Sequence, residues 1–227
     1  MRAWCSLIFL LLSLNAVSRD GTGNVVSGSK RSKFVTPQEL ATELTSSYHS
    51  DIEKVRSIFS WITDNISYNV RPSYHRNASV SVYDDANDTG ALKPLNERVA
   101  EGVLRKRVAF CDGYARLFKT LCDYAGITSE LITGYAKTSN RKRTDYSFRS
   151  NHRWNAVMID STWKLLDATW ASGYISSGSN DFVRRFDDKY FLSPPEEFIK
   201  DHYPEDTRWT LLPSPPSFKD YLNAPLY

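Results

Sequence analysis

The chain has 227 residues, of which 41% are hydrophobic and 13% aromatic. This length suits one globular domain with short appendages, and this composition can fill a hydrophobic core. The formal net charge of +3, on a chain that is 24% charged, is too small to indicate binding to nucleic acid or to a membrane surface.

The N-terminus has the three-part pattern of a secretory signal peptide over residues 1–18. Arg2 supplies the positive start, residues 7–12 form a short apolar run, and Ala16 to Ser18 offers a small-x-small cleavage site. The run is shorter than the roughly 20 residues that a membrane-spanning helix needs, so we expect no membrane span. The pattern predicts a secreted or periplasmic protein, and a buried N-terminal helix is the alternative.

A flexible leader rich in glycine, serine and charge is expected over residues 19–33, followed by a single domain over residues 34–227. Two capping-box motifs, beginning at Thr36 and Ser50, mark helix starts in the first part of that domain. We expect helices over residues 36–44, 50–64 and 96–105, a short strand over 66–68, and a long polar surface loop over 71–95.

The segment over residues 108–126 carries the clearest helical pattern. Its apolar residues recur at helical spacing, and Gly126 is placed as the C-terminal stop, which predicts a helix of about four turns beginning at Cys111. Cys122 lies on the same helix, so the two Cα atoms should be about 16 Å apart. A disulfide tolerates about 7 Å at most. We therefore expect two free thiols.

After Gly126 the pattern changes from helical to β-prone. We expect strands over residues 131–135, 154–159 and 162–169, a polar basic loop over 137–150, and a short helix from Ser193. Asp160-Ser161 predicts a tight hairpin between the last two strands. The proline-rich tail is expected to have no regular structure. Helices followed by an antiparallel sheet indicate an α+β fold.

Cys111 is the strongest candidate for a nucleophile. The positive end of a helix dipole favours the thiolate, although the adjacent Asp112 works against it. Cys122, among apolar neighbours inside the helix, reads as a buried core residue. A nucleophilic cysteine needs a base and an orienting group.

His152 is the candidate base, because it alone of the four histidines begins a predicted strand; His202 falls near the tail. If Asp160-Ser161 is a two-residue turn, His152 lies opposite Thr169 and Asp167 lies diagonal to His152 on the same face. The alternative is that each of the three residues has a structural role alone.

The motifs around these residues resemble the transglutaminase-like superfamily of papain-like cysteine enzymes. The resemblance extends over roughly residues 36–220. The segments upstream and downstream of the motifs resemble the branch of the superfamily that is named after kyphoscoliosis peptidase. It is carried by Phe110-Cys111-Asp112-Gly113-Tyr114-Ala115, His152-Arg153-Trp154-Asn155-Ala156-Val157 and Trp163-Lys164-Leu165-Leu166-Asp167-Ala168-Thr169-Trp170. Arg153 departs from the pattern, which usually has a small residue there, and is expected to narrow or charge the cleft.

The resemblance implies a papain-like core whose nucleophile helix packs on an antiparallel sheet, with Cys111, His152 and Asp167 as a catalytic triad acting on protein or peptide amides. The backbone N–H of Cys111 is the expected oxyanion donor, with Trp61 and Tyr68 as candidates for a second. Hydrolysis is favoured over cross-linking, because animal transglutaminases require calcium and extra domains, and no EF-hand-like motif occurs here. We expect no cofactor and no metal. A calcium-independent transglutaminase and a non-catalytic binding module are the alternatives.

Overall fold

The computed structural model describes residues 36–70, 93–138 and 146–225. All of them belong to one compact unit, Phe34–Tyr227. The expected signal peptide, the leader and most of the 71–95 loop lie outside the described residues. These three stay predictions.

The first half of the unit is helical, as the sequence predicts. Helices α1 (Pro37–Thr45) and α2 (Asp51–Asn65) both begin with the expected capping boxes. Helix α3 (Leu95–Lys106) and helix α4 (Cys111–Tyr124) follow, with Gly126 in the left-handed conformation just past the end of α4. The short strands β1 (Ser67–Tyr68) and β2 (Val108–Ala109) pair in parallel. In the chain, β1 precedes α3 and β2 precedes α4.

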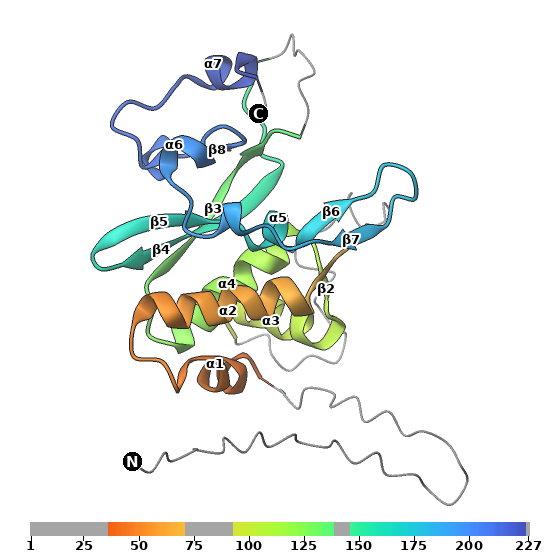
Figure 1. Cartoon of the computed structure of the whole chain (residues 1–227), viewed down its shortest axis with the longest axis vertical. Helices are drawn as coiled ribbons and strands as arrows, with labels where there is room; N and C mark the ends of the chain where they lie inside the picture. Colours follow the sequence, from red (N-terminus) through yellow and green to blue (C-terminus); the bar gives the residue numbers. More distant parts are fainter. Residues whose placement is uncertain (1–35, 71–92, 139–145, 226–227) are drawn as a thin grey trace, which may run out of the picture. The chain divides into compact units, whose positions relative to one another are not determined.

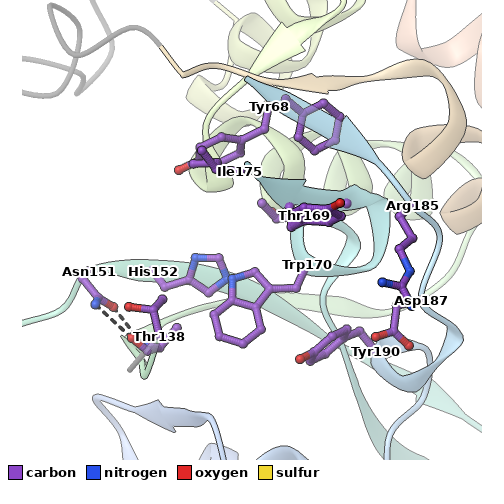
Figure 2. A pocket seen from close by; sticks show the side chains of 14 residues that line it. Tyr68, Thr138, Asn151, His152, Thr169, Trp170, Ile175, Arg185, Asp187 and Tyr190 are labelled. Atoms are coloured by element: carbon purple, nitrogen blue, oxygen red, sulfur yellow. Dashed lines mark hydrogen bonds between the residues drawn. The ribbon is translucent and has the colours of Figure 1, made fainter. Parts of the chain in front are cut away.

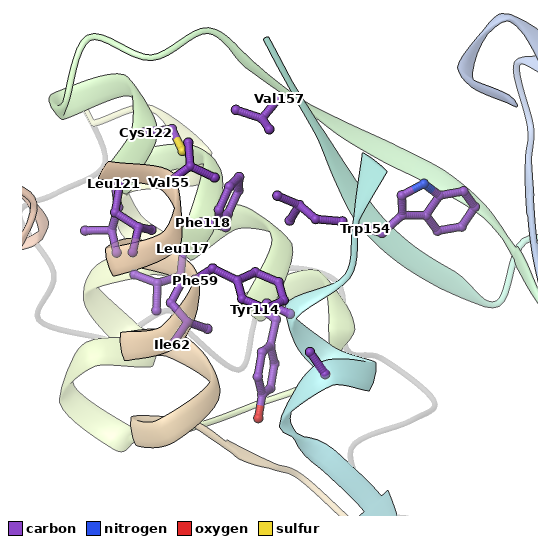
Figure 3. Packing of buried hydrophobic residues seen from close by; sticks show 14 of the residues in the cluster. Val55, Phe59, Ile62, Tyr114, Leu117, Phe118, Leu121, Cys122, Trp154 and Val157 are labelled. Atoms are coloured by element: carbon purple, nitrogen blue, oxygen red, sulfur yellow. The ribbon is translucent and has the colours of Figure 1, made fainter. Parts of the chain in front are cut away.

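The core lies between α2, α4 and the sheet (Figure 3). The buried side chains of α2 face those of α4, and Val157 approaches them from the sheet. Trp154 lies on the opposite side of its strand. Cys111 and Cys122 are both free, which confirms the expected pair of thiols.

A four-stranded antiparallel sheet forms the second half, in the order β5-β4-β3-β8. Its strands are β3 (Ser129–Ala136), β4 (His152–Ile159), β5 (Thr162–Leu166) and β8 (His202–Pro204). Ile159 pairs with Thr162, and Asp160 and Ser161 have φ of 48° and 60°, so the predicted two-residue hairpin is confirmed.

The segment after β5 differs from the prediction. Strand β5 ends at Leu166, because Asp167 caps a short helix, α5 (Ala168–Ser172). A second hairpin follows, β6 (Gly173–Ile175) with β7 (Phe182–Arg184), and then the 3-10 helix η3 (Asp188–Tyr190). The prediction of one strand over 162–169 was therefore too long.

The prediction that the tail lacks regular structure was wrong. After α6 (Pro195–Phe198), strand β8 joins the sheet, and η4 (Thr207–Thr210) and α7 (Phe218–Asn223) follow (Figure 1). Pro204 is tolerated because β8 is an edge strand, where a missing backbone donor leaves no ladder bond unmade. The fold is α+β, with α4 packed on an antiparallel sheet, as predicted. Among the described helices, none has the length and apolar character needed to cross a membrane.

Candidate active site

Cys111 is the first residue of α4 and is half-buried. Its position follows from the local sequence, because Phe110 adopts an extended conformation and the helical apolar pattern begins directly after it. The first backbone N–H groups of a helix have no partner within the helix and carry its positive dipole end. The side chain of Cys111 therefore lies at the positive end of the α4 dipole.

The charge of Asp112, next to Cys111, is met by two arginines. Arg116 lies one turn along α4, and its Nε is 2.9 Å from Oδ1 of Asp112. Arg153 on β4 donates from Nη1 to the same oxygen. Arg153 thus binds Asp112 of α4, next to Cys111. That it narrows or charges the cleft stays a prediction.

His152 and Asp167 are hydrogen bonded in the interior. Nε2 of His152 lies 2.7 Å from Oδ2 of Asp167, and 7% and 1% of their side chains are exposed. The hairpin register places Asp167 close to His152, but Asp167 reaches it as the N-cap of α5, not as a strand residue. The predicted contact between His152 and Asp167 is therefore present, but Asp167 lies at a helix N-cap and not on the predicted strand.

The electrostatics of this group centre on His152. Burial alone would lower its pKa, but the charge and hydrogen bond of Asp167, with a hydrogen bond and charge from Cys111, outweigh burial and raise the pKa to about 10. Since Nε2 is bonded to Asp167, Nδ1 is the ring nitrogen left for Cys111. The structure therefore brings all three predicted residues together, in the order Cys111, His152, Asp167.

Asp167 is held by four hydrogen bonds. Its Oδ1 accepts from the backbone N–H groups of Thr169 and Trp170, at 2.7 and 3.2 Å. Its Oδ2 lies 2.7 Å from His152 and 3.1 Å from Nε2 of His202. Burial would raise the pKa of this carboxyl, but the charge and hydrogen bonds of the two histidines hold it well below its ordinary value.

His202 is a site residue that the sequence did not predict, because it falls next to a proline-rich segment that was expected to be irregular. It lies on β8, with none of its side chain exposed, and its Nδ1 is 2.6 Å from Oδ1 of Asp201. Asp201 in turn accepts hydrogen bonds from Lys189 and from the hydroxyl of Tyr190. The only sequence signal was the pair Asp201-His202 itself, which predicts no position in the fold.

Among the described residues, His152, Asp167 and His202 also bring possible metal-ligand atoms within 4.8 Å of one another. These atoms are already hydrogen bonded, at 2.7 and 3.1 Å. Ligands of a tetrahedral zinc lie about 2.0 Å from the metal, and hence about 3.3 Å from one another. A metal would have to break both bonds, so the donor set fits a hydrogen-bonded group better than a metal centre.

A cavity of about 720 Å³ opens beside His152. Figure 2 shows the imidazole next to Trp170, with Asn151 and Thr138 on one side and Arg185, Asp187 and Tyr190 on the other. Tyr68, from β1, also lines it. Burial and the charge of Cys111 raise the pKa of the Tyr68 hydroxyl, which keeps it a hydrogen-bond donor.

Comparisons with known proteins show which family the chain resembles. The family model described as "Transglutaminase-like superfamily" matches residues 38–168. Kyphoscoliosis peptidase of Mus musculus is 34% identical over 187 residues, which covers 82% of this chain and 26% of that protein. Hillarin of Drosophila melanogaster is 32% identical, with 82% of this chain and 22% of hillarin covered.

A solved structure of a TGase has 19% sequence identity and a TM-score of 0.39, over 75% of this chain and 41% of that one. The chain spans about a quarter of the length of the curated relatives it matches. Since the family model covers more than half of the 227 residues, the chain belongs to the transglutaminase-like superfamily.

Proposed function

We propose that the chain is a cysteine-dependent acyl-transfer enzyme with Cys111 as nucleophile, His152 as acid–base partner and Asp167 as orienting group. The observation that carries this proposal is the buried 2.7 Å contact between His152 and Asp167, beside the cysteine that begins α4. A structural cysteine needs no such partner, whereas a nucleophile needs a base and the base needs an orienter.

The proposed reaction begins when the Cys111 thiolate attacks an amide carbonyl carbon. The negative charge moves to the carbonyl oxygen, where the backbone N–H of Cys111 and the hydroxyl of Tyr68 can donate hydrogen bonds. Of the two candidates for the second donor, Tyr68 is preferred, because it lines the pocket while Trp61 stacks with Arg107. The C–N bond then breaks as His152 protonates the leaving amine, and a thioester remains on Cys111.

The thioester is resolved when His152 accepts a proton from an incoming nucleophile, which attacks the carbonyl carbon. The C–S bond then breaks, and Cys111 leaves as the thiolate. Water would give hydrolysis of a protein or peptide amide, and a lysine amine would give a cross-link. We favour hydrolysis, because the relative of 34% identity is named a peptidase. A calcium-independent transglutaminase is the alternative, and the same intermediate serves both reactions.

The test is the pH dependence of Cys111 alkylation by iodoacetamide in the native protein, read by mass spectrometry. Cys122 is an internal control, because it is fully buried and burial raises the pKa of its thiol. We expect Cys111 to react at pH 6 and Cys122 to stay protected. In His152→Ala, reaction of Cys111 at pH 6 should fall by roughly tenfold or more.

Casein incubated with a fluorescent primary amine then separates the acyl acceptors. New peptide termini indicate hydrolysis, and incorporated amine indicates transfer; both should be lost in Cys111→Ala. If Cys111 alkylation does not depend on His152, the chain is a non-catalytic binding module on this fold.

Export is proposed as well, on the sequence pattern of residues 1–18 alone. N-terminal sequencing of the protein expressed from its full reading frame tests this. A mature start close to residue 19 supports export, and an intact N-terminus contradicts it.

A further inference from the structure

We propose that His202 is a positioning residue of this site, a fixed imidazolium that holds Asp167 ionised and oriented toward His152. The inference rests on the proposed function, because it assigns the support of the same triad. It adds a second histidine, from the last strand of the sheet, to the residues on which the reactivity of Cys111 depends.

We assign the charge of His202 from its hydrogen-bond geometry. Its Nε2 lies 3.1 Å from Oδ2 of Asp167, and its Nδ1 lies 2.6 Å from Oδ1 of Asp201. An ionised carboxylate has no proton to donate, so each contact requires an N–H on the imidazole. A ring that donates from both nitrogens is the cationic form. His202 is therefore an imidazolium between two carboxylates.

Asp167 and Asp201 both have pKa values below the ordinary value of an aspartate, which favours their ionised forms. Burial would raise the pKa of Asp201, but the hydrogen bonds and charges of His202 and Lys189 lower it. Nζ of Lys189 lies 3.0 Å from Oδ2 of Asp201, and the Tyr190 hydroxyl donates to the same oxygen at 3.1 Å. The ionisable groups around His202 are thus Asp167, Asp201, His152 and Tyr190, with Lys189 behind Asp201.

The ring of His202 is also held in place by packing. Phe198 of α6 stacks on it, with ring centroids 4.3 Å apart and an interplanar angle of 26°. Trp170 of α5 and Trp154 of β4 contact it edge-on, at 4.5 and 5.0 Å between centroids. Since no part of the side chain is exposed, the ring cannot turn away from Asp167 without moving this aromatic cage.

The result is a line of alternating charges through the interior. A thiolate at Cys111 would be followed by His152, Asp167, His202 and Asp201, and the line ends at Lys189 on the surface side. Without His202, one acceptor position of the buried Asp167 carboxylate has no donor, which disfavours its ionised form. His152 would then be a weaker partner for the thiolate.

Two substitutions separate the contacts of His202. In His202→Gln the amide nitrogen can take the place of Nε2 and donate to Asp167. In His202→Asn the shorter amide takes the place of Nδ1 and faces Asp201 instead. The measurement is the iodoacetamide pH profile of Cys111 in the full chain, with Cys122 as the reporter of unfolding and exposed His49→Asn as the control.

We expect His202→Asn to lower Cys111 alkylation at pH 6 by roughly tenfold, the effect of about one pKa unit in the charged pair. Cys111 alkylation at pH 6 should fall by a smaller factor in His202→Gln and should be unchanged in His49→Asn. Cys122 should stay protected in all of these variants. Asp201→Asn should shift the profile in the same direction as His202→Asn by a smaller factor.

The outcomes are distinguishable from failure of the proposed function. If Cys111 alkylation is already independent of His152, the proposed function fails. If it depends on His152 but is unchanged in folded His202→Asn, the positioning role is overturned. Should Cys122 become reactive in His202→Asn, the folded His202→Gln and Asp201→Asn variants decide, and unchanged profiles in both overturn the inference.

Discussion

Asp167 is the residue at which helix capping and the charge of the site meet. One carboxylate oxygen accepts two backbone N–H groups at the start of α5, and the other accepts from two histidines. A carboxylate can accept hydrogen bonds at about four positions, so Asp167 can accept from all four donors at once. An amide has one oxygen and one NH₂ group, so it cannot replace the carboxylate at both ends.

We therefore predict that Asp167→Asn is destabilising even though asparagine is a good N-cap. In either orientation of the amide, its NH₂ group faces N–H donors, which leaves buried groups unsatisfied at a cost of about 1–3 kcal/mol. Urea denaturation measures this. Asp206→Asn is the matched control, because Asp206 caps η4 at the exposed surface and its replacement should cost less than ~0.5 kcal/mol. Equal small losses in both variants would contradict the four-bond role.

The raised pKa of His152 leads us to predict that the folded chain becomes less stable as the pH rises. Its pKa is about 10 in the folded chain against an ordinary value of 6.5. A group whose pKa rises on folding stabilises the folded state fully below its unfolded pKa, and that stabilisation is lost as pH rises through the folded pKa. The free energy of unfolding should therefore fall from about pH 6.5 to about pH 10. Urea titrations across this range should show a smaller slope in His152→Gln, and parallel profiles would contradict the prediction.

At the scale of elements, the start of α4 is a junction between helix and sheet. Asp112 in its first turn is bound by Arg116 on the same helix and by Arg153 on β4. Asn155 of β4 also donates to the carbonyl of Ala115, at 3.0 Å. These contacts fix the helix N-terminus on the strand that carries His152, and they neutralise the acid beside Cys111.

Without Arg153, only Arg116 among the described residues would remain to offset the negative charge of Asp112 beside Cys111. In Arg153→Ala we predict that alkylation of Cys111 near neutral pH slows by no more than roughly fivefold, the factor for ~1 kcal/mol at a partly exposed ion pair. Asp112→Asn/Arg153→Ala should recover the rate, because the repelling charge is gone. A double variant as slow as the single one would mean that Arg153 acts through packing instead.

The sequence predicted the elements whose signals are local and long. The capping boxes of α1 and α2, the helical period of α4 and the Asp160-Ser161 turn all lie within their own segments. Helix α5 and strand β8 are too short for a period, and Pro204 argues against a strand until its edge position is known. The same limit explains why Asp167 was placed on a strand and why His202 was passed over.

At the scale of the whole molecule, the central strand β3 sets how closely the two histidine strands approach. Gly134 of β3 pairs with His152 on one side and with Pro204 on the other. A Cβ at this glycine would lie 2.2 Å from the Trp154 ring and 2.5 Å from the backbone oxygen of Tyr203. A side chain there would force the strands or the indole to move.

We predict that Gly134→Ala destabilises the chain by roughly 1–3 kcal/mol, as overpacking of a filled core does. The expected shift of β4 against β8 should also slow Cys111 alkylation, while the change at a surface glycine should do neither. Gly178→Ala is that control, because its Cβ would meet no atom within 4 Å. Thermal unfolding with parallel alkylation measures both effects, and equal behaviour of the two variants would refute the close-packing argument.

Strand β8 comes from the last part of the chain, although it pairs with β3 and carries His202 beside Asp167. During translation, a ribosome-bound chain holds Cys111, His152 and Asp167 before residue 202 has been synthesised. In that interval the carboxylate lacks its second histidine, and one edge of β3 has no partner strand. The order of synthesis therefore places this second contact of Asp167 after the three residues that precede it in the chain, and a chain that ended before β8 would leave one acceptor position of Asp167 without a donor.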